Sequence, residues 1–150
     1  MKIAVGEGRK VVMYWIHTLV ISLVFLLVIA VVKYEGIDVA ELPSSDKTFA
    51  EADADVGCGS VHSQAKLKDI FEENYKNHWF VWSGRVISAD AGSVLLDMNG
   101  GLADVSVDFE NDRDGYDVTE GSMLTVRFFM SRAGGCVLPF VGENGQIVAQ

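Results

Sequence analysis

The pattern of apolar and polar positions divides the chain into one uninterrupted apolar run and a polar remainder. The run extends from Val11 to Val32. About 20 apolar residues, each rising roughly 1.5 Å along a helix, span the hydrocarbon core of a bilayer. The run therefore predicts a single transmembrane helix over residues 11–32. A cleaved signal peptide is the alternative, since Val28-Ile29-Ala30 resembles a small-residue cleavage site, although the run exceeds the usual signal core of about 7–15 residues.

The charges on either side of this run predict the orientation of the helix. Residues 1–10 carry three basic residues and one acidic residue, whereas residues 33–150 carry 9 Lys and Arg against 20 Asp and Glu, a net charge of −11. Basic residues tend to stay on the cytoplasmic side of a membrane. We therefore expect a cytoplasmic leader over residues 1–10 and a periplasmic or otherwise extracytoplasmic C-terminal part, anchored in the inner or plasma membrane.

Residues 33–60 are typical of a flexible acidic linker. The segment Leu42-Pro43-Ser44-Ser45 interrupts regular structure. Glu51, Asp53 and Asp55 then alternate with Ala and Val without forming a sustained apolar face. A flexible chain of about 25 residues has a reach of about 25–30 Å, which is enough to hold a domain away from the bilayer.

The residues after the linker predict a short helix and then a series of strands. Leu67, Ile70 and Phe71, together with Asn74 or Tyr75, fall on one face of a helix. Beyond position 77 the apolar residues recur at every second position, as in a strand whose two faces differ. Strands are expected around residues 79–86, 93–98, 103–109, 123–130 and 136–141, and residues 146–148 would extend the last of them. Asn99-Gly100-Gly101 is typical of the turn in a hairpin.

A helix followed by five short strands predicts the fold class of residues 61–150. We expect a mainly β domain, a small five-stranded OB-like barrel with one short helix before it. The acidic break between the third and fourth predicted strands lies where such a barrel often has its long connection.

Two segments of the predicted barrel also match the motifs of a known family. Tyr75–Val86 reads YKNHWFVWSGRV and is similar to a Tyr-Lys-Gly-Lys-x-Val-x-Val-Ser/Thr-Gly-x-Val motif at the start of a first strand. Glu120–Val126 is similar to a later Gly-x-x-Val-x-Val motif. Through these motifs, residues 65–141 resemble the bacterial OB-fold family named for its likeness to tRNA anticodon-binding domains. The chain departs from the family at Asn77 and Phe128, where Gly is usual. The resemblance implies a fold and a membrane or lipid attachment, but no activity.

The two cysteines, Cys58 and Cys136, predict a disulfide. Outside the cytosol such a pair is more often bonded than free. The bond would join the linker to the barrel and close a loop of about 80 residues, which stabilises a fold by roughly 4–5 kcal/mol in the chain-entropy account. Two isolated cysteines do not form a metal site, because such a site needs more ligands.

Residues 110–120, ENDRDGYDVTE, approach the pattern of a calcium-binding loop. Oxygen ligands recur at alternate positions and a Gly stands sixth, where the sharp turn is needed. The candidate ligands are Glu110, Asp112, Asp114 and Glu120. The loop begins with Glu rather than Asp, and Glu120 lies one residue before the twelfth position. Calcium is therefore the one cofactor considered, and a solvated acidic loop is the alternative.

The first predicted strand also contains a candidate contact surface for a partner. If Phe80, Trp82 and Val86 point into the barrel, Trp79 and Val81 point outward. An outward Trp beside a Val forms an apolar spot of the kind that binds proteins or peptides. Cover by the preceding helix or linker is the alternative. The acidic surroundings favour a basic partner.

Catalysis and nucleic-acid binding find little support in the sequence. Nothing resembles a nucleophile elbow, a HExxH pair or a phosphate-binding glycine loop. Residues 60–150 carry 7 basic against 13 acidic residues, and this net negative charge repels phosphate. We therefore predict a single-pass, non-catalytic protein-binding or assembly module of a membrane-associated envelope complex. The alternative is a ligand- or calcium-binding accessory domain; an enzyme ranks third, and a single-stranded nucleic-acid binder is a remote possibility.

Overall fold

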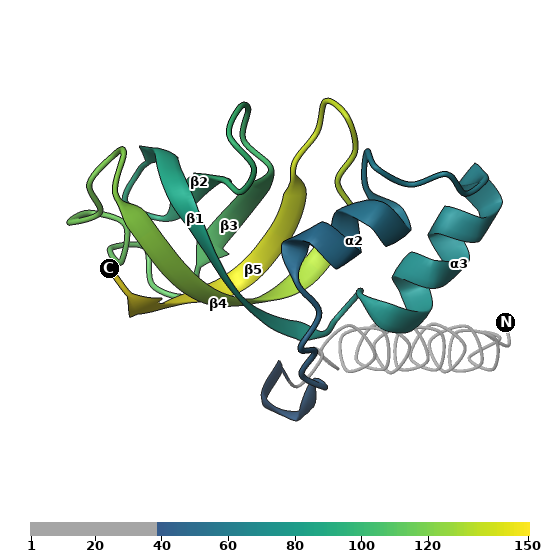
Figure 1. Cartoon of the computed structure of the whole chain (residues 1–150). Coiled ribbons are helices and arrows are strands. Elements are labelled where there is room, and N and C mark those ends of the chain that lie inside the picture. The colour runs from purple at the N-terminus through teal and green to yellow at the C-terminus, as the bar shows by residue number, and fades with distance from the viewer. Residues whose placement is uncertain (1–38) are drawn as a thin grey trace, which may run out of the picture. The chain divides into compact units, whose positions relative to one another are not determined.

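The computed structural model describes residues 39–150 (Figure 1). The predicted cytoplasmic leader (1–10) and transmembrane helix (11–32) lie outside the described residues. Between positions 39 and 150, no helix combines the length and the apolar character needed to cross a membrane. Residues 41–150 form one compact unit.

Five strands close into a barrel in the order β1-β2-β3-β5-β4 (Figure 1). The β3–β5 pair is parallel and the other four pairs are antiparallel. This confirms the prediction of a mainly β, five-stranded barrel, which has two short α-helices before it rather than one. The elements in chain order are the 3-10 helix η1 (Val39–Glu41), α2 (Phe49–Val56), α3 (Gln64–Asn74), β1 (Trp79–Ala89), β2 (Ser93–Asp97), β3 (Val105–Phe109), β4 (Met123–Arg132) and β5 (Phe140–Ala149).

Alternation along the strands builds the interior of the barrel. On β1, Phe80, Trp82 and Val86 are buried, as the period-two pattern predicts. Opposite them on β4, Val126 and Phe128 are fully buried. The rings of Trp82 and Phe128 meet edge to face at 5.4 Å between centroids, a favourable arrangement for two aromatic rings.

Helix α2 contradicts the expectation of a flexible linker up to residue 60. Its first turn is closed by a capping box, in which the Thr48 side chain accepts from the Glu51 amide and the Glu51 carboxylate accepts from the Thr48 amide. Ala52 and Val56 are buried in the core, and Phe49 packs against it. These three residues lie on one helical face, which the acidic residues between them obscure in the sequence.

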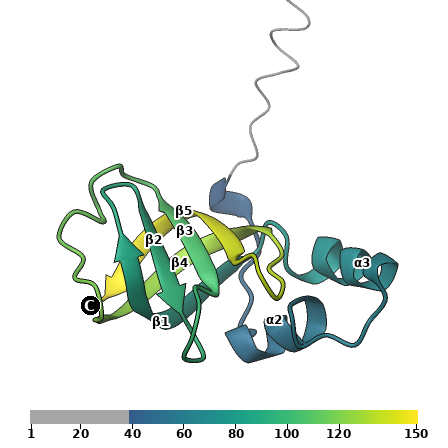
Figure 2. The same cartoon turned by 90° about the horizontal axis from the view of Figure 1, so that it is seen from above.

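Helix α3 confirms the predicted amphipathic helix. Ser63 caps its N-terminus, and Phe71 is buried in the same core as the barrel residues. Figure 2 shows α2 and α3 on the same side of the barrel. The chain then turns into β1 through Asn77, whose φ of 57° lies in the left-handed region. Asn tolerates this region better than most residues, so it suits this turn.

The last strand differs from its prediction. Residues 136–139 belong to the β4–β5 loop, and β5 runs from Phe140 to Ala149. A Cβ on Gly142 would lie 2.2 Å from the Phe128 ring, so only Gly leaves room for that buried aromatic residue. Gly142 and the left-handed Asn144 interrupt the apolar alternation, and the sequence pattern therefore breaks inside a continuous strand.

Candidate functional site

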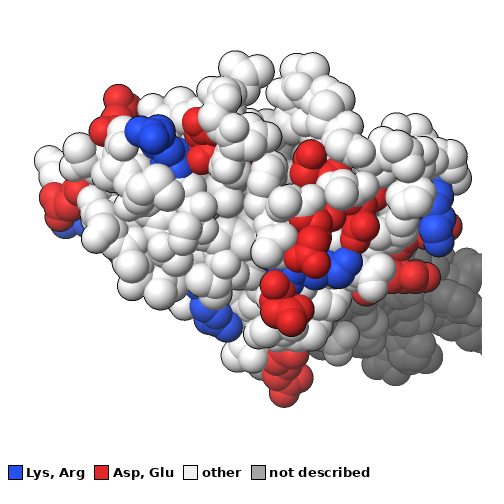
Figure 3. Space-filling model, in the orientation of Figure 1, with Lys and Arg blue, Asp and Glu red and all other residues white. Residues whose placement is uncertain are grey.

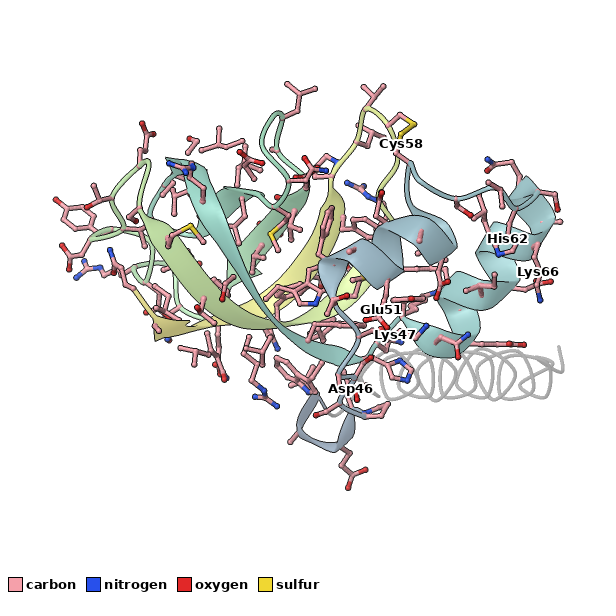
Figure 4. The ribbon with its side chains drawn as sticks, in the orientation of Figure 1. Asp46, Lys47, Glu51, Cys58, His62 and Lys66 are labelled. Atoms are coloured by element: carbon pink, nitrogen blue, oxygen red, sulfur yellow. A yellow bond between two sulfur atoms is a disulfide. The ribbon has the colours of Figure 1, made fainter. Side chains whose placement is uncertain are left out.

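The predicted disulfide is present and joins two loops beside one end of the barrel. Cys58 and Cys136 are bonded, with 4.5 Å between their Cα atoms and a sequence separation of 78. Figure 4 shows the bond at the junction of the α2–α3 connection and the β4–β5 loop. Both cysteines are exposed. The bond therefore forms part of the surface and borders the cavities around it.

A groove of about 410 Å³, with apolar and polar lining residues, lies beside this disulfide. Its aromatic residues are Phe49 of α2 and Phe140 of β5, whose rings meet edge to face at 5.9 Å. Leu102 of the β2–β3 loop lines the groove as well. The carboxylate-bearing residues Asp53 and Asp104 complete its polar edge, and no Lys or Arg is among its lining residues.

Large apolar side chains stand in solvent on the loops around this groove. Leu102 is 77% exposed on the β2–β3 loop, and Val137 and Leu138 are 85% and 63% exposed on the β4–β5 loop. Figure 1 shows these two loops projecting from the barrel in the same direction. We call Leu102, Val137 and Leu138 the apolar loop tips. An exposed set of this kind beside a groove is typical of an interaction surface.

Hydrogen bonds hold both loops in shape. The Asp104 carboxylate accepts from the Met98 amide at 2.8 Å, and the Asp97 carboxylate accepts from the Gly100 amide. That bond from Gly100 is the main reason that the pKa of Asp97 is lowered. In the β4–β5 loop, the Gly135 amide donates to the Leu138 carbonyl at 2.8 Å. The loop tips are therefore presented by closed turns.

A polar cluster of Lys47, Asp55 and Tyr75 fixes the helical wall behind the groove. The Asp55 carboxylate accepts from Lys47 Nζ at 2.6 Å and from the Tyr75 hydroxyl at 2.6 Å, and the Trp82 indole donates to the Lys47 carbonyl at 2.9 Å. Figure 4 places Lys47 beside Glu51 at the start of α2. The cluster thus ties the segment before α2 to α3 and β1.

The electrostatics of this cluster favour its charged, bonded form. Hydrogen bonds from Lys47 and Tyr75 lower the pKa of Asp55, and the bond to Asp55 raises the pKa of Lys47. Burial raises the pKa of Tyr75 to about 12. At neutral pH, Lys47 is therefore protonated and the Asp55 oxygen already has two donors. The arrangement suits structural support better than nucleophilic or general-base chemistry.

Trp79 is not the exposed residue that the sequence predicts. It is 5% exposed, whereas Val81 is 54% exposed. The Arg127 guanidinium lies 3.9 Å from the centroid of the Trp79 ring, and Phe129 meets this ring edge to face. The Trp79 amide also donates to the Pro43 carbonyl. Neighbours on the same outer face of β1 and β4 thus cover the indole, and only Val81 of the predicted pair is accessible.

The predicted calcium ligands do not come together. Among residues 39–150, no three His, Cys, Asp or Glu side chains gather in a way that could hold a metal ion. Glu110 instead accepts from the Gln146 side chain at 2.7 Å, and Asp114 accepts from Asn111. The segment that contains Asp112 and Glu120 turns back onto the β1–β2 loop, where the Gly115 amide donates to the Ala91 carbonyl. Glu110 and Asp114 therefore bond to neighbouring amide side chains of the domain.

The charge of the folded unit remains strongly acidic. Residues 41–150 carry 8 Lys and Arg against 18 Asp and Glu. On the face shown in Figure 3, carboxylates gather over the region of α2, the helix that contributes Glu51, Asp53 and Asp55. This distribution opposes the approach of a phosphate backbone and favours the approach of a basic partner.

Comparisons of the chain with protein-family profiles, with curated proteins and with solved structures find no match.

Proposed function

We propose that residues 41–150 form an OB-like domain that binds a protein partner without catalysis, as an assembly module of a membrane-associated envelope complex. The observation that carries this proposal is the set of apolar loop tips, Leu102, Val137 and Leu138, standing beside an aromatic-lined groove. When a partner covers such side chains, removal of their apolar surface from water stabilises the complex by roughly 25 cal/mol for each Å² buried. An apolar centre with polar residues around it is typical of a protein interface.

The strand order supports the OB-like assignment. A five-stranded barrel with the order β1-β2-β3-β5-β4 and one parallel pair, β3–β5, has the arrangement expected of that fold. The longest connection between its strands, residues 110–122, follows β3. Because OB-like barrels bind varied ligands through their loops, the fold is compatible with the proposal, and the site chemistry decides the partner class.

The charges around the groove indicate what kind of protein fits it. Asp53 and Asp104 line the groove, and no cation is among its lining residues. A partner segment with an aliphatic or aromatic side chain for the groove and a Lys or Arg beside it would match both features. Opposite charges would also speed the encounter in a salt-dependent way.

The proposed setting follows from the apolar run and the disulfide together. Val11–Val32 has the length of a membrane span, and a bonded cysteine pair is characteristic of proteins outside the cytosol. An anchored domain meets its partner at a raised local concentration. A modest interface would then suffice for assembly.

The proposal is tested by site-specific photocrosslinking of the full-length chain in its native membranes. A photoreactive amino acid at position 102 or 138 should give a discrete adduct with one protein. The same group in place of Tyr116, which is 80% exposed on the β3–β4 connection, serves as the matched control and should give none.

A second variant makes the test quantitative. Combining Leu102→Ser and Leu138→Ser should lower recovery of the crosslinked protein in pull-downs to about a tenth, since a loss of about 1.4 kcal/mol from two apolar contacts of an interface is tenfold in affinity. Val148→Ser, at an exposed residue of β5, should leave recovery unchanged. Equal adducts at positions 116 and 138, or equal recovery with all variants, would rule out the groove as the binding surface.

A further inference from the structure

A second and larger cavity also lies beside the disulfide. Its volume is about 660 Å³, within the range of small-molecule sites. It is bordered by the α2–α3 connection, by α3, and by the end of β4 with the loop that follows. Val56 and Phe71 contribute buried apolar side chains, and Leu67 contributes a half-buried one. Cys58 and Cys136 line both this cavity and the groove described above, so the disulfide is a border that the two share.

The charge around this cavity is opposite to that of the rest of the folded unit. Three of the eight basic residues of residues 41–150 line it, namely Lys68, Lys76 and Arg132. Glu72 is the single acidic residue among its lining residues, and its carboxylate is bonded to Lys76 Nζ at 2.8 Å. The cavity is therefore a local basic site in an acidic domain.

Two of these cations are available to a ligand. Within residues 39–150, neither Lys68 nor Arg132 forms an ion pair, and both side chains are exposed. Lys68 comes from α3 and Arg132 from the end of β4, so the charges approach the cavity from different walls. Their ammonium and guanidinium groups can bind one anionic group between them, and guanidinium favours a planar carboxylate.

The start of α3 adds to this field. The helix begins at Gln64 behind its N-cap Ser63, and Gln64 lines the cavity together with His62. The N-terminal end of a helix carries a partial positive charge. Since this helix has 11 residues, its dipole reinforces the attraction of Lys68 and Arg132 for an anion.

We propose that this cavity binds a small organic anion that combines an apolar body with one carboxylate. The carboxylate lies between Lys68 and Arg132, and the apolar body packs against Val56, Leu67 and Phe71. A free carboxylic acid and the C-terminal carboxylate of a peptide share this chemistry. The site differs from the groove in its charge and in most of its lining residues, so it extends the function beyond the binding of a basic partner.

The experiment measures ligand binding to the full-length chain in lipid nanodiscs by saturation-transfer NMR, with empty nanodiscs subtracted. The probes are 4-phenylbutyrate and its uncharged counterpart 4-phenylbutan-1-ol, and acetyl-Gly-Gly-Phe with a free carboxylate and with a C-terminal amide. Saturable binding is expected for the two carboxylates and at least about tenfold weaker binding for the neutral partners, since a charged hydrogen bond accounts for such a factor.

Variants locate the binding. Arg132→Gln should raise Kd about tenfold and Lys68→Gln about fivefold, with each loss removing one charge-assisted contact. Lys66→Gln is the matched control, because Lys66 is exposed on the same helix but does not line the cavity, and its Kd should stay within about twofold of the wild type. Raising the salt concentration should weaken binding to the wild type far more than binding to a variant that combines Lys68→Gln with Arg132→Gln.

Each outcome decides the proposal. Three results overturn the proposal. They are equal binding of phenylbutyrate and phenylbutanol, an equal effect of Lys66→Gln and Lys68→Gln, and no saturable binding up to millimolar probe. Tighter binding of the free acid or of the peptide acid assigns the source of the carboxylate, and either result supports the site. Unchanged melting temperatures of the variants exclude unfolding as the cause of a lost affinity, because both substituted side chains are exposed.

Discussion

Breaking the disulfide should remove a large part of the stability of the folded unit. The bond joins residues 78 positions apart in the sequence. In the chain-entropy account, a cross-link across such a loop lowers the entropy of the unfolded chain and raises its free energy by about 4.5 kcal/mol at 25 °C. A domain of this size is typically stable by about 5–15 kcal/mol. The loss is therefore comparable with the lower end of the total stability.

The reduced domain should nevertheless fold, because core packing holds the same elements together. Ala52 and Val56 of α2 and Phe71 of α3 are buried in one cluster with the barrel residues. The double variant Cys58→Ser/Cys136→Ser should keep the far-ultraviolet circular dichroism of the wild type. We expect its free energy of unfolding to be about 3–4.5 kcal/mol lower and its Tm about 15–25 °C lower.

The measurement is urea unfolding of the full-length chain, followed by tryptophan fluorescence, with Trp15→Phe in every protein so that the signal comes from Trp79 and Trp82 in the barrel. Reductant added to the wild type should reproduce the loss seen in the double variant, and reductant added to the double variant should change nothing. If both reduced and substituted proteins lose less than about 1 kcal/mol, the loop-closure reasoning is wrong for this chain. If the free energy of unfolding depends on urea concentration with the same slope in the wild type and the double variant, unfolding exposes the same surface area in both proteins.

Three further predictions concern single side chains. Tyr75→Phe removes the hydroxyl that donates to Asp55 and should cost about 1–2 kcal/mol in thermal unfolding at pH 7. Because burial raises the pKa of Tyr75 to about 12, the unfolded tyrosine ionises first. The advantage of the wild type over this variant should therefore be complete below pH 10 and shrink between about pH 10 and 12. Gly142→Ala places a methyl group against a buried ring and should destabilise the fold by about 1–3 kcal/mol. The control is Gly135→Ala, which should be close to neutral because nothing lies within 4 Å of the added Cβ. Equal melting temperatures for the two variants would contradict this packing. Trp79→Ala should cost about 3–5 kcal/mol as the loss of a buried aromatic residue, whereas Val81→Ala should cost less than about 0.5 kcal/mol; if Trp79→Ala keeps the wild-type Tm, the indole is not part of the packed structure.

The barrel could be predicted from the sequence where a strand has one face inside and one face outside. On β1, Phe80, Trp82 and Val86 fall on one side of a period-two pattern, with Ser83 and Arg85 on the other side, and this identifies the strand and its inner face. On β5, Gly142 replaces an apolar residue because the Phe128 ring occupies its side-chain space. The apolar pattern therefore breaks at a position where burial is complete, and the strand could be identified only in part.

Helix α2 was missed because its apolar stripe is narrow. Phe49, Ala52 and Val56 are spaced as one face of a helix, but Ala52 is small and the residues between them are largely acidic. The capping box of Thr48 and Glu51 was the available signal. A short helix of this kind is stabilised mainly by its packing against the barrel, which the sequence does not contain.

The candidate site was predictable only where it depends on residue type alone. With two cysteines in the chain, a disulfide had one connectivity, and Cys58–Cys136 is formed. The groove combines Phe49, Leu102 and Phe140, which come from three distant segments. The β2–β3 loop lies near β5 because β3 pairs with β5, and Phe49 of α2 joins them through its ring contact with Phe140. The prediction that Trp79 is exposed was wrong because Arg127 and Phe129 on the paired strand pack against its ring.

The position of the disulfide at the border of the two cavities predicts that reduction affects them unequally. The groove depends on Phe49 and Phe140, whose rings are held by packing with Trp82 inside the core. The basic cavity depends on Lys68, which lies in the exposed first half of α3 after the connection that Cys58 tethers. Loss of the tether frees that connection without removing the core contacts. Reductant at a temperature where the domain stays folded should therefore weaken phenylbutyrate binding at least about threefold, the change expected when a preorganised site becomes mobile. Crosslinking at position 102, on the β2–β3 loop that the disulfide does not tether, should keep the yield of the oxidised protein. Equal loss of both activities would show that the disulfide acts through global stability alone.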